Sequence, residues 1–262
     1  MKTILVPIDF SPLSRAASEY ASYFAKITGA EVHLLHTFLE IPVSIEPPVP
    51  EMISGGQIQT EYESLINKEI EFLKEKYLVN VQGYAVSGFK QSKINDVCEK
   101  LNADLIVMGA GNTALGSIRN SKVPVMVIPE QASFKPVKHI VLAVDFVEIT
   151  NPACFDLLSE IVEKFDAMLQ VVHVKKKSLE AGLEEIGKLQ LAMLLSKVTY
   201  WYQQIEAEGV EEGIKEFIQS HPADLLVMVA HRHNIFQRIF GTIHTSAITY
   251  ETNLPLLVLE DK

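Results

Sequence analysis

The sequence predicts an α/β protein made of two doubly wound domains in tandem. Three observations support this fold class: short apolar segments recur along the chain, amphipathic segments separate them, and the whole series occurs twice. Strands that are apolar throughout and separated by helices are typical of a parallel sheet covered on both faces. We therefore expect each half of the 262-residue chain to form one such sheet.

The internal repeat is read from three pairs of segments that occur in the same order. The matched pairs are KTILVPIDF (2–10) with KHIVLAVDF (138–146), ADLIVMGA (103–110) with ADLLVMVA (223–230), and VPVMVIPE (123–130) with LPLLVLED (254–261). Segments that match in this way indicate two copies of one domain. The predicted domains span residues 1-132 and 136-262, with the boundary inside EQASFKPV.

Each copy is expected to contribute five strands. The expected strands cover 3–8, 31–37, 81–86, 104–108 and 123–128 in the first copy, and 140–144, 168–174, about 202–207, 224–229 and 254–259 in the second. The first helix is expected to have Ser11 as its N-cap, Pro12 at its first position and Gly29 at its end. The stretch 191–209, which contains Trp201 and Tyr202, predicts a buried helix that runs into a strand.

The two copies differ in length at two places. Residues 39–57 of the first copy, with four prolines and two glycines, predict an ordered surface loop or flap that the second copy lacks. The fourth-strand motifs start at 103 and 223, whereas the fifth-strand prolines stand at 124 and 255. The offsets are therefore 120 and 131 residues, and the first copy is 11 residues shorter between these strands.

Composition excludes several classes of protein. A formal net charge of −10 argues against nucleic-acid binding, which needs a basic face. Cys98 and Cys154 are far apart and are expected to be buried free thiols in a reducing compartment. No signal peptide and no membrane-spanning segment are predicted, so a cytoplasmic location without membrane association is expected.

The motifs together resemble the universal stress protein family in its tandem two-domain form. The resemblance is carried by ILVPIDFS, VHLLHTF, ADLIVMGA and NSKVPVMVIP in the first copy, and by IVLAVDF, LQVVHV, ADLLVMVA and TNLPLLVLE in the second. It implies two flavodoxin-like (Rossmann-like) domains, each with a five-stranded parallel sheet, whose fifth strands meet at a pseudo-two-fold axis. It also implies a role in the stress response.

The resemblance further implies where a nucleotide such as ATP or AMP would bind. An aspartate that closes the first strand meets the nucleoside, backbone at the end of the second strand meets adenine, and a glycine-rich loop after the fourth strand wraps the phosphates. The matching positions are Asp9, Thr37, Gly109, Gly111 and Asn112 in the first copy, and Asp145, Val174, Gly241 and Thr242 in the second.

The phosphate loop departs from the family pattern in both copies. The first copy lacks the middle of the loop, and the second has Val229 and the run His231-Arg232-His233 where glycines are expected. Gly109 to Thr113 are interpreted either as a reduced anion site or as a tight turn in which Asn112 or Thr113 caps a helix that opens near Asn112.

Further residues also leave alternatives open. Asp9 and Asp145 are candidates for a ribose contact or for a turn that precedes a helix. A basic group is interpreted as an anion contact, an incomplete metal site or a solvated loop, and its residues are His231, Arg232, His233 and Arg238, with His244 as a further metal candidate. An apolar group is interpreted as core packing or a docking patch for a partner, and its residues are Ile235, Phe236, Ile239 and Phe240.

No catalytic motif is recognised, and no Walker sequence is present. We therefore expect a non-enzymatic stress protein that acts through protein contacts, with its nucleotide site degraded and no resident cofactor. The alternatives are an ATP- or AMP-binding member with an altered loop, including a weak ATPase, and a carrier of another small molecule in the vacated pocket. A homodimer is a further candidate assembly.

Overall fold

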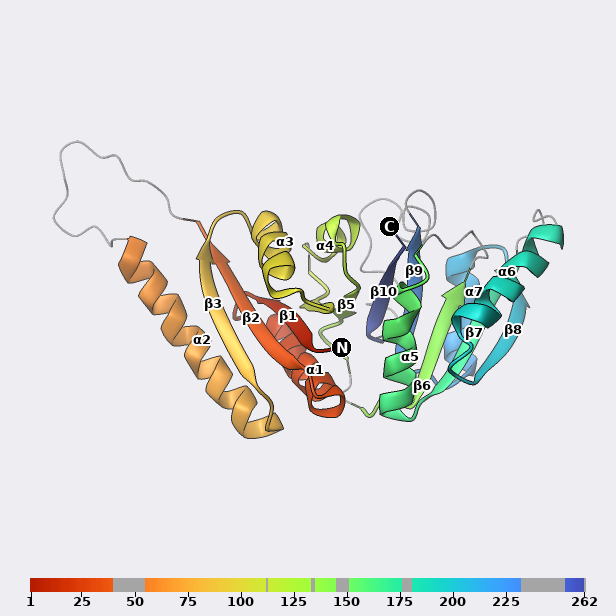
Figure 1. Cartoon of the computed structure of the whole chain (residues 1–262), viewed down its shortest axis with the longest axis horizontal. Coiled ribbons are helices and arrows are strands. Elements are labelled where there is room, and N and C mark those ends of the chain that lie inside the picture. Colours follow the sequence, from red (N-terminus) through yellow and green to blue (C-terminus); the bar gives the residue numbers. More distant parts are fainter. Residues whose placement is uncertain are drawn as a thin grey trace. The chain divides into compact units, whose positions relative to one another are not determined.

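The computed structural model describes residues 1–39, 55–111, 113–132, 135–144, 151–175, 181–231 and 253–261. The chain divides into two compact units, residues 2–108 and residues 109–262 together with Met1. Figure 1 labels the elements of both units. In the described parts of the chain, no helix is long and apolar enough to cross a membrane.

The first unit is a parallel sheet with the strand order β3-β2-β1-β4 and helices packed against it. Its strands are β1 (Thr3–Ile8), β2 (Glu31–Phe38), β3 (Val81–Ser87) and β4 (Leu105–Gly109). Its helices are α1 (Pro12–Thr28), α2 (Gly55–Tyr77) and α3 (Lys90–Leu101). These strands confirm the expected ones to within a residue at each end. The core strand β1 is fully buried at Ile4, Leu5 and Val6.

The second unit has the strand order β5-β10-β9-β6-β7-β8. Its strands are β5 (Val125–Ile128), β6 (His139–Val144), β7 (Met168–Lys175), β8 (Tyr200–Glu206), β9 (Leu225–His231) and β10 (Leu256–Asp261). Its helices are α4 (Ala114–Asn120), α5 (Cys154–Phe165), α6 (Ala181–Leu194) and α7 (Val210–Ser220). Five of its strands, β6 to β10, are mutually parallel, as predicted for the second copy.

The fifth strands of the two copies pair with each other. β5 lies antiparallel to β10, with Met126 opposite Leu257. This pairing places β5 in the second unit, so the compact units divide at residue 109. The domain spans 1-132 and 136-262 stay a prediction from the sequence.

The first helix begins and ends as predicted. The Ser11 hydroxyl accepts a hydrogen bond from the Ser14 N–H (3.2 Å), and Pro12 opens the helix. At the other end Gly29 adopts φ = 79°, and its N–H donates to the Ala25 carbonyl (2.8 Å). Because glycine has no side chain to clash in this left-handed region, Gly29 is a favoured end for α1.

The prediction of a loop over residues 39–57 is wrong for its last three residues. α2 begins at Gly55, so residues 55–57 are helical, and residues 40–54 lie outside the described chain. Further along α2, Ile66 and Leu73 are buried against the unit.

A carboxylate at the start of β4 binds the start of β1. Oδ2 of Asp104 accepts hydrogen bonds from the N–H groups of Lys2 (2.6 Å) and Thr3 (2.9 Å). The Asp104 N–H in turn donates to the Thr3 carbonyl (2.9 Å). These bonds fix the register between the two strands, in which Ile4 lies opposite Leu105.

The second copy repeats this contact. Oδ2 of Asp224 accepts from the N–H groups of Lys138 (3.0 Å) and His139 (2.9 Å), and the Asp224 N–H donates to the His139 carbonyl (2.8 Å). The aspartate of the repeated ADL sequence is therefore a structural residue in both halves.

We expect Asp104→Ala to lower the free energy of unfolding by about 2 kcal/mol, because two strand N–H groups lose their acceptor. Urea denaturation of the purified chain measures this change. Asp224→Ala should give a loss of similar size, whereas Asp96→Ala, at a carboxylate that pairs with Lys93 on the same helix, should change stability by less than about 0.5 kcal/mol. Equal stability of Asp104→Ala and the wild type would contradict the assignment.

The close packing of α2 against β3 depends on Gly83. A Cβ at Gly83 would overlap Cγ2 of Ile66 and lie 3.1 Å from Cδ1 of Ile70. Ile66 is buried and β-branched, so its methyl group cannot move without a change of rotamer. A side chain at this position would therefore push α2 away from the sheet.

We expect Gly83→Ala to lower the free energy of unfolding by about 1 to 3 kcal/mol through this overpacking. Gly209→Ser is the matched control, because the space around Gly209 is open and serine is favoured at its helix N-cap. Thermal and urea unfolding of both variants provide the measurement. A Gly83→Ala variant as stable as the control would show that α2 can move away from β3 without loss of stability, and would contradict the prediction.

Candidate functional site at the carboxyl ends of β1 and β2

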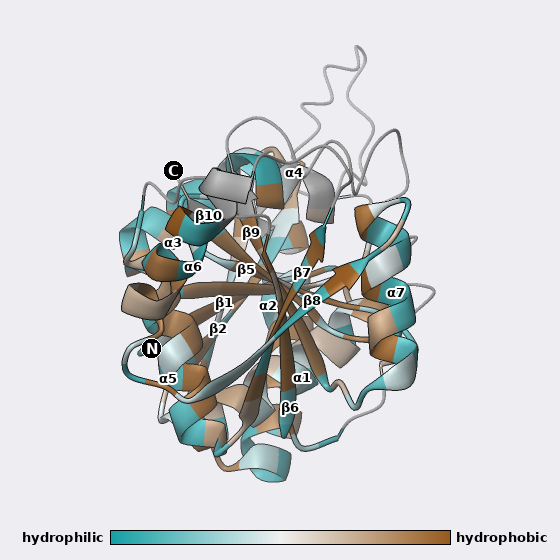
Figure 2. Cartoon of the chain, turned by 90° about the vertical axis from the view of Figure 1, so that its right-hand side faces the viewer, coloured by the Kyte–Doolittle hydropathy of each residue, from teal (hydrophilic) through white to brown (hydrophobic). Residues whose placement is uncertain are grey.

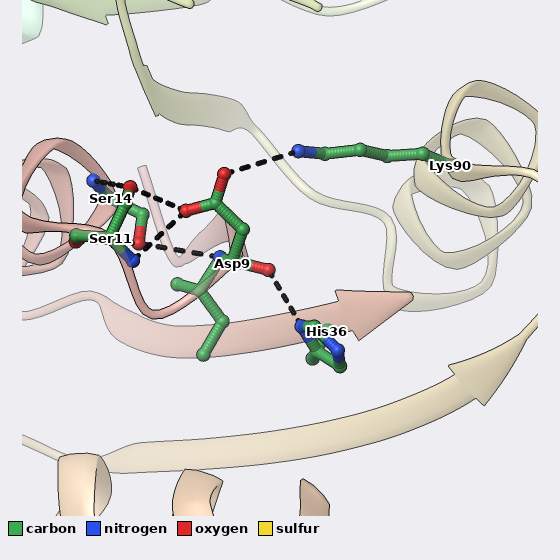
Figure 3. Close-up of polar contacts among 6 residues, drawn as sticks. Asp9, Ser11, Ser14, His36 and Lys90 are labelled. Carbon is green, nitrogen blue, oxygen red and sulfur yellow. Dashed lines mark hydrogen bonds and ion pairs between the residues drawn. The ribbon is translucent and has the colours of Figure 1, made fainter. Parts of the chain in front are cut away.

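The candidate site lies where β1 and β2 end, since ligands of open α/β sheets bind outside the carboxyl ends of the strands. Asp9 directly follows β1, and its Oδ1 accepts hydrogen bonds from the Ser11 N–H (3.2 Å) and the Ser11 hydroxyl (2.5 Å) (Figure 3). Asp9 thus holds the turn that leads into α1. This geometry confirms the turn interpretation of Asp9, and the ribose contact stays a prediction.

The other oxygen of Asp9 faces a lysine. Oδ2 lies 4.0 Å from Nζ of Lys90, the first residue of α3 (Figure 3). Partial burial acts to raise the pKa of Asp9, but the hydrogen bonds from Ser11, a further one from Ser14 and the charge of Lys90 outweigh it, so the pKa is lowered. The carboxylate is charged at neutral pH, and 54% of its side chain is exposed.

His36 bridges the ends of the two strands. Nδ1 lies 3.0 Å from the carbonyl oxygen of Ile8, so Nδ1 carries the proton and donates it to that oxygen in the neutral ring (Figure 3). Burial and, to a smaller extent, the positive charge of Lys90 lower the pKa of His36. The hydrogen bond to Ile8 and the negative charge of Asp9 act to raise it, but the pKa stays below its usual value. His36 is therefore a neutral, oriented imidazole.

Aromatic rings surround His36. The ring centroids of Phe10 and Tyr62 lie 4.7 Å and 4.3 Å from that of His36, and Phe38 lies 5.3 Å from Tyr62. We call Phe10, His36, Phe38 and Tyr62 the aromatic cluster. Phe10 has φ = 62°, an unfavourable backbone angle for an aromatic residue, and this places strain beside Asp9.

The second unit repeats the histidine contact. Nδ1 of His173 lies 2.9 Å from the carbonyl oxygen of Val144, the last residue of β6, and His173 is buried. Both copies therefore use the second-strand histidine to join the carboxyl ends of their first two strands.

The residues predicted to contact adenine lie inside strands. Thr37 is the second-last residue of β2 and lies opposite Val86 of β3. Val174 is buried in β7 opposite Ile205, and its side chain packs where a Cβ of Gly213 would lie. The contact with adenine stays a prediction at both positions.

The glycine loop of the first copy is closed by its own hydrogen bonds. The Ala110 N–H donates to the Ile128 carbonyl (2.9 Å), and the Gly111 N–H donates to the Gly109 carbonyl (2.7 Å). The Gly111 carbonyl then accepts from the Ala114 N–H (3.0 Å). The first N–H groups after β4 therefore bind protein oxygens, which is the geometry of a tight turn.

The helix after this loop starts later than predicted. α4 begins at Ala114 instead of near Asn112, and Thr113 occupies the N-cap position without a side-chain hydrogen bond. The tight-turn interpretation allowed Asn112 or Thr113 as the N-cap residue. Thr113 holds that position, but with α-helical backbone angles (φ = −84°, ψ = −16°) its side chain makes no capping hydrogen bond.

Several predicted site residues lie outside the described chain. They are Asn112, Asp145, Gly241 and Thr242, together with the basic and apolar groups between Arg232 and His244. His231 ends β9, and its side chain is likewise not described. Within the described residues, no group of three or more His, Cys, Asp or Glu side chains is placed to hold a metal ion.

Comparison with known proteins decides the family. The model of the universal stress protein family matches residues 1–129. Residues 1–129, just under half of the chain, therefore belong to the universal stress protein family. A universal stress protein of Methanocaldococcus jannaschii is 28% identical over 141 residues, which cover 48% of this chain and 81% of that protein.

Solved structures extend the likeness to both copies. A universal stress protein from Archaeoglobus fulgidus matches with a TM-score of 0.74 and 16% identity over 99% of this chain and 96% of its own. A putative universal stress protein from Pseudomonas aeruginosa matches with a TM-score of 0.64 and 14% identity, over 99% of this chain and 93% of its own. The cytoplasmic domain of a prokaryotic cation chloride cotransporter matches with a TM-score of 0.57 and 13% identity, over 99% of this chain and 96% of its own. At these identities, the matches show a shared α/β fold.

Some residues of this universal stress protein site were missed from the sequence. The role of His36 was visible in principle, since VHLLH and LQVVH both place a histidine at the end of the second strand. Lys90 and Tyr62 gave no such signal, because they reach Asp9 and His36 from helices distant in sequence. Only the packing of α2 and α3 on the sheet brings them to the site.

We expect the imidazole of His36 to titrate below pH 6.5 and to carry its proton on Nδ1 when neutral, as observed by nitrogen-15 NMR. Because its pKa is lower in the folded than in the unfolded chain, its stabilising contribution is complete above about pH 6.5 and is lost as the pH falls through the folded-state pKa. His36→Gln should flatten this part of the pH dependence of unfolding. An ordinary pKa for His36 would contradict the assignment.

Proposed function

We propose that the chain is a non-enzymatic universal stress protein that acts in the stress response through contacts with other proteins, and that its phosphate-binding loop is degraded in both copies. For the first copy, the observation that carries this proposal is the closed turn after β4; for the second copy, the proposal rests on Val229 and His231-Arg232-His233 in the sequence. The N–H groups of Ala110 and Gly111 donate to Ile128 and Gly109, so they are not directed at a phosphate. A phosphate loop works through N–H groups that are free to point at the ligand.

The aromatic cluster supports the same function. The rings of Phe10 and Tyr62 pack on His36 at the end of β2, where the family resemblance places adenine. Tyr62 comes from α2, so the closure of this region depends on the packing of that helix. The position that the family resemblance gives to adenine therefore lies beside these rings.

The same cluster favours a second candidate, a carrier of another small molecule. Phe10 is 36% exposed and the Asp9 side chain 54%, so an apolar surface and a carboxylate lie side by side. A third candidate, an ATP- or AMP-binding member with an altered loop, is favoured by the exposed oxygen of Asp9, which could accept from a ribose hydroxyl. Each candidate includes a cytoplasmic location.

Calorimetry with ATP, ADP and AMP, with and without Mg²⁺, tests the proposal. We expect no binding tighter than about 10 μM, or about 7 kcal/mol. Tighter binding would overturn the degraded-loop proposal, and Asp9→Ala and Asp145→Ala would then locate the nucleotide, with Asp96→Ala as the control carboxylate. A small molecule that co-purifies and is identified by native mass spectrometry would support the carrier instead.

A further inference from the structure

The outer edge of β8 has no neighbouring strand among the described residues. β8 ends the strand order of the second unit, and its partner there is β7. Figure 2 faces this end of the unit and shows β8 across the front of the view, with no drawn helix in front of it. Backbone N–H and C=O groups along this edge therefore face outward, as a template for another strand.

The sequence of β8 has few of the features that protect exposed edges, since its one charged residue, Glu206, stands at the end of the strand. Residues 200–205, YWYQQI, contain no charged residue, no proline and no glycine, and they are rich in β-forming side chains. Trp201 is 72% exposed. A tryptophan on an unprotected edge is a large apolar surface that another chain can cover.

The corresponding edge of the first unit is built differently. At the position of Trp201 in β8, β3 carries Gln82. Gln82 lies opposite His33 of β2, and Trp201 lies opposite Gln170, the matching residue of β7. α2 packs against β3 through Gly83, at the position that Tyr202 occupies in β8. The described part of α2 has 23 residues and packs against β3, whereas α6 has 14 described residues.

The residues of β8 are complementary to themselves. When two β8 strands pair antiparallel about Gln203, Trp201 lies opposite Ile205 of the other copy, an aromatic side chain against a branched aliphatic one. Tyr200 then lies opposite Glu206, so the two carboxylates do not face each other. All seven residues of the strand are paired, whereas a shift of the centre to a neighbouring residue leaves residues at the strand ends without a partner.

From this edge and its self-complementary sequence we propose that β8 pairs antiparallel, centred on Gln203, with β8 of a second copy of this chain. The antiparallel pair closes a two-fold dimer and uses the edge completely. A parallel pair would place Glu206 opposite Glu206 and cannot close by a two-fold axis. The proposal is independent of whether a nucleotide binds.

Charge exchange at Gln203 tests the pairing. Sedimentation velocity of the full chain between about 1 and about 200 μM should show a monomer–dimer equilibrium. Gln203→Lys and Gln203→Glu should each weaken the dimer at least tenfold, since like charges then face each other across the axis. An equimolar mixture of the two variants should restore it. Gln82→Lys, at the edge of β3, is the control and should dimerise like the wild type.

Cross-linking tests the register. Gln203→Cys should give a disulfide-linked dimer on mild oxidation, because residue 203 lies opposite itself. Trp201→Cys should not, because its two copies would be about 13 Å apart along the strands, beyond disulfide reach. Cys98 and Cys154 are buried and do not compete.

Three outcomes would overturn the proposal. They are a monomer throughout the concentration range, a dimer that the charged variants leave unchanged, and equal cross-linking from Cys at 201 and at 203. If the chain stays monomeric and its β8 edge instead binds an extended peptide of another sequence, the proposal is likewise overturned.

Discussion

The fold rests on a carboxylate that binds the first N–H groups of a buried strand in each half. Asp104 does this for β1, and Asp224 does it for β6. A hydrogen bond to a charged acceptor contributes about 1.5 to 3 kcal/mol, and the bonds from Thr3 and His139 are partly buried, whereas those from Lys2 and Lys138 are exposed. The same contact sets the register of the first strand against its neighbour and so determines where the strand ends. The positions of Asp9 and of the Ile8 carbonyl depend on that register.

At the carboxyl ends, polar groups that could bind a ligand serve the fold first. Asp9 uses one oxygen to hold the turn into α1, and His36 uses its N–H to join β2 to β1. The N–H groups of Ala110 and Gly111 close the turn after β4. A site of this kind is well ordered before any ligand arrives, but its donors are largely committed. This commitment of donors to the fold is the physical argument behind the proposal that the phosphate-binding loop is degraded.

The two copies repeat the sheet more faithfully than its surroundings. The aspartate and histidine contacts recur with nearly the same distances, because both copies must join the same strands. The helices differ, since a helix on the outer strand needs only to cover it. With α2 the first copy covers β3 closely through Gly83, whereas the second copy places Trp201 and Tyr202 on a more exposed strand. The prediction for 191–209 was a buried helix that runs into a strand. α6 and β8 confirm the helix and the strand, but Met193 on α6 is 70% exposed.

The sequence by itself determined the repeat, the order of strands and helices, and the ends of α1. These follow from local patterns: apolar periodicity, Ser11 and Gly29 as caps, and the recurrence of ADL and of the second-strand histidine. Only the tertiary structure decided that Lys90 faces Asp9, that Tyr62 packs on His36, and that the N–H of Ala110 binds Ile128. These contacts join residues that are far apart in the chain, and no local pattern encodes them. They arise because helices settle on the sheet wherever their apolar faces can be buried.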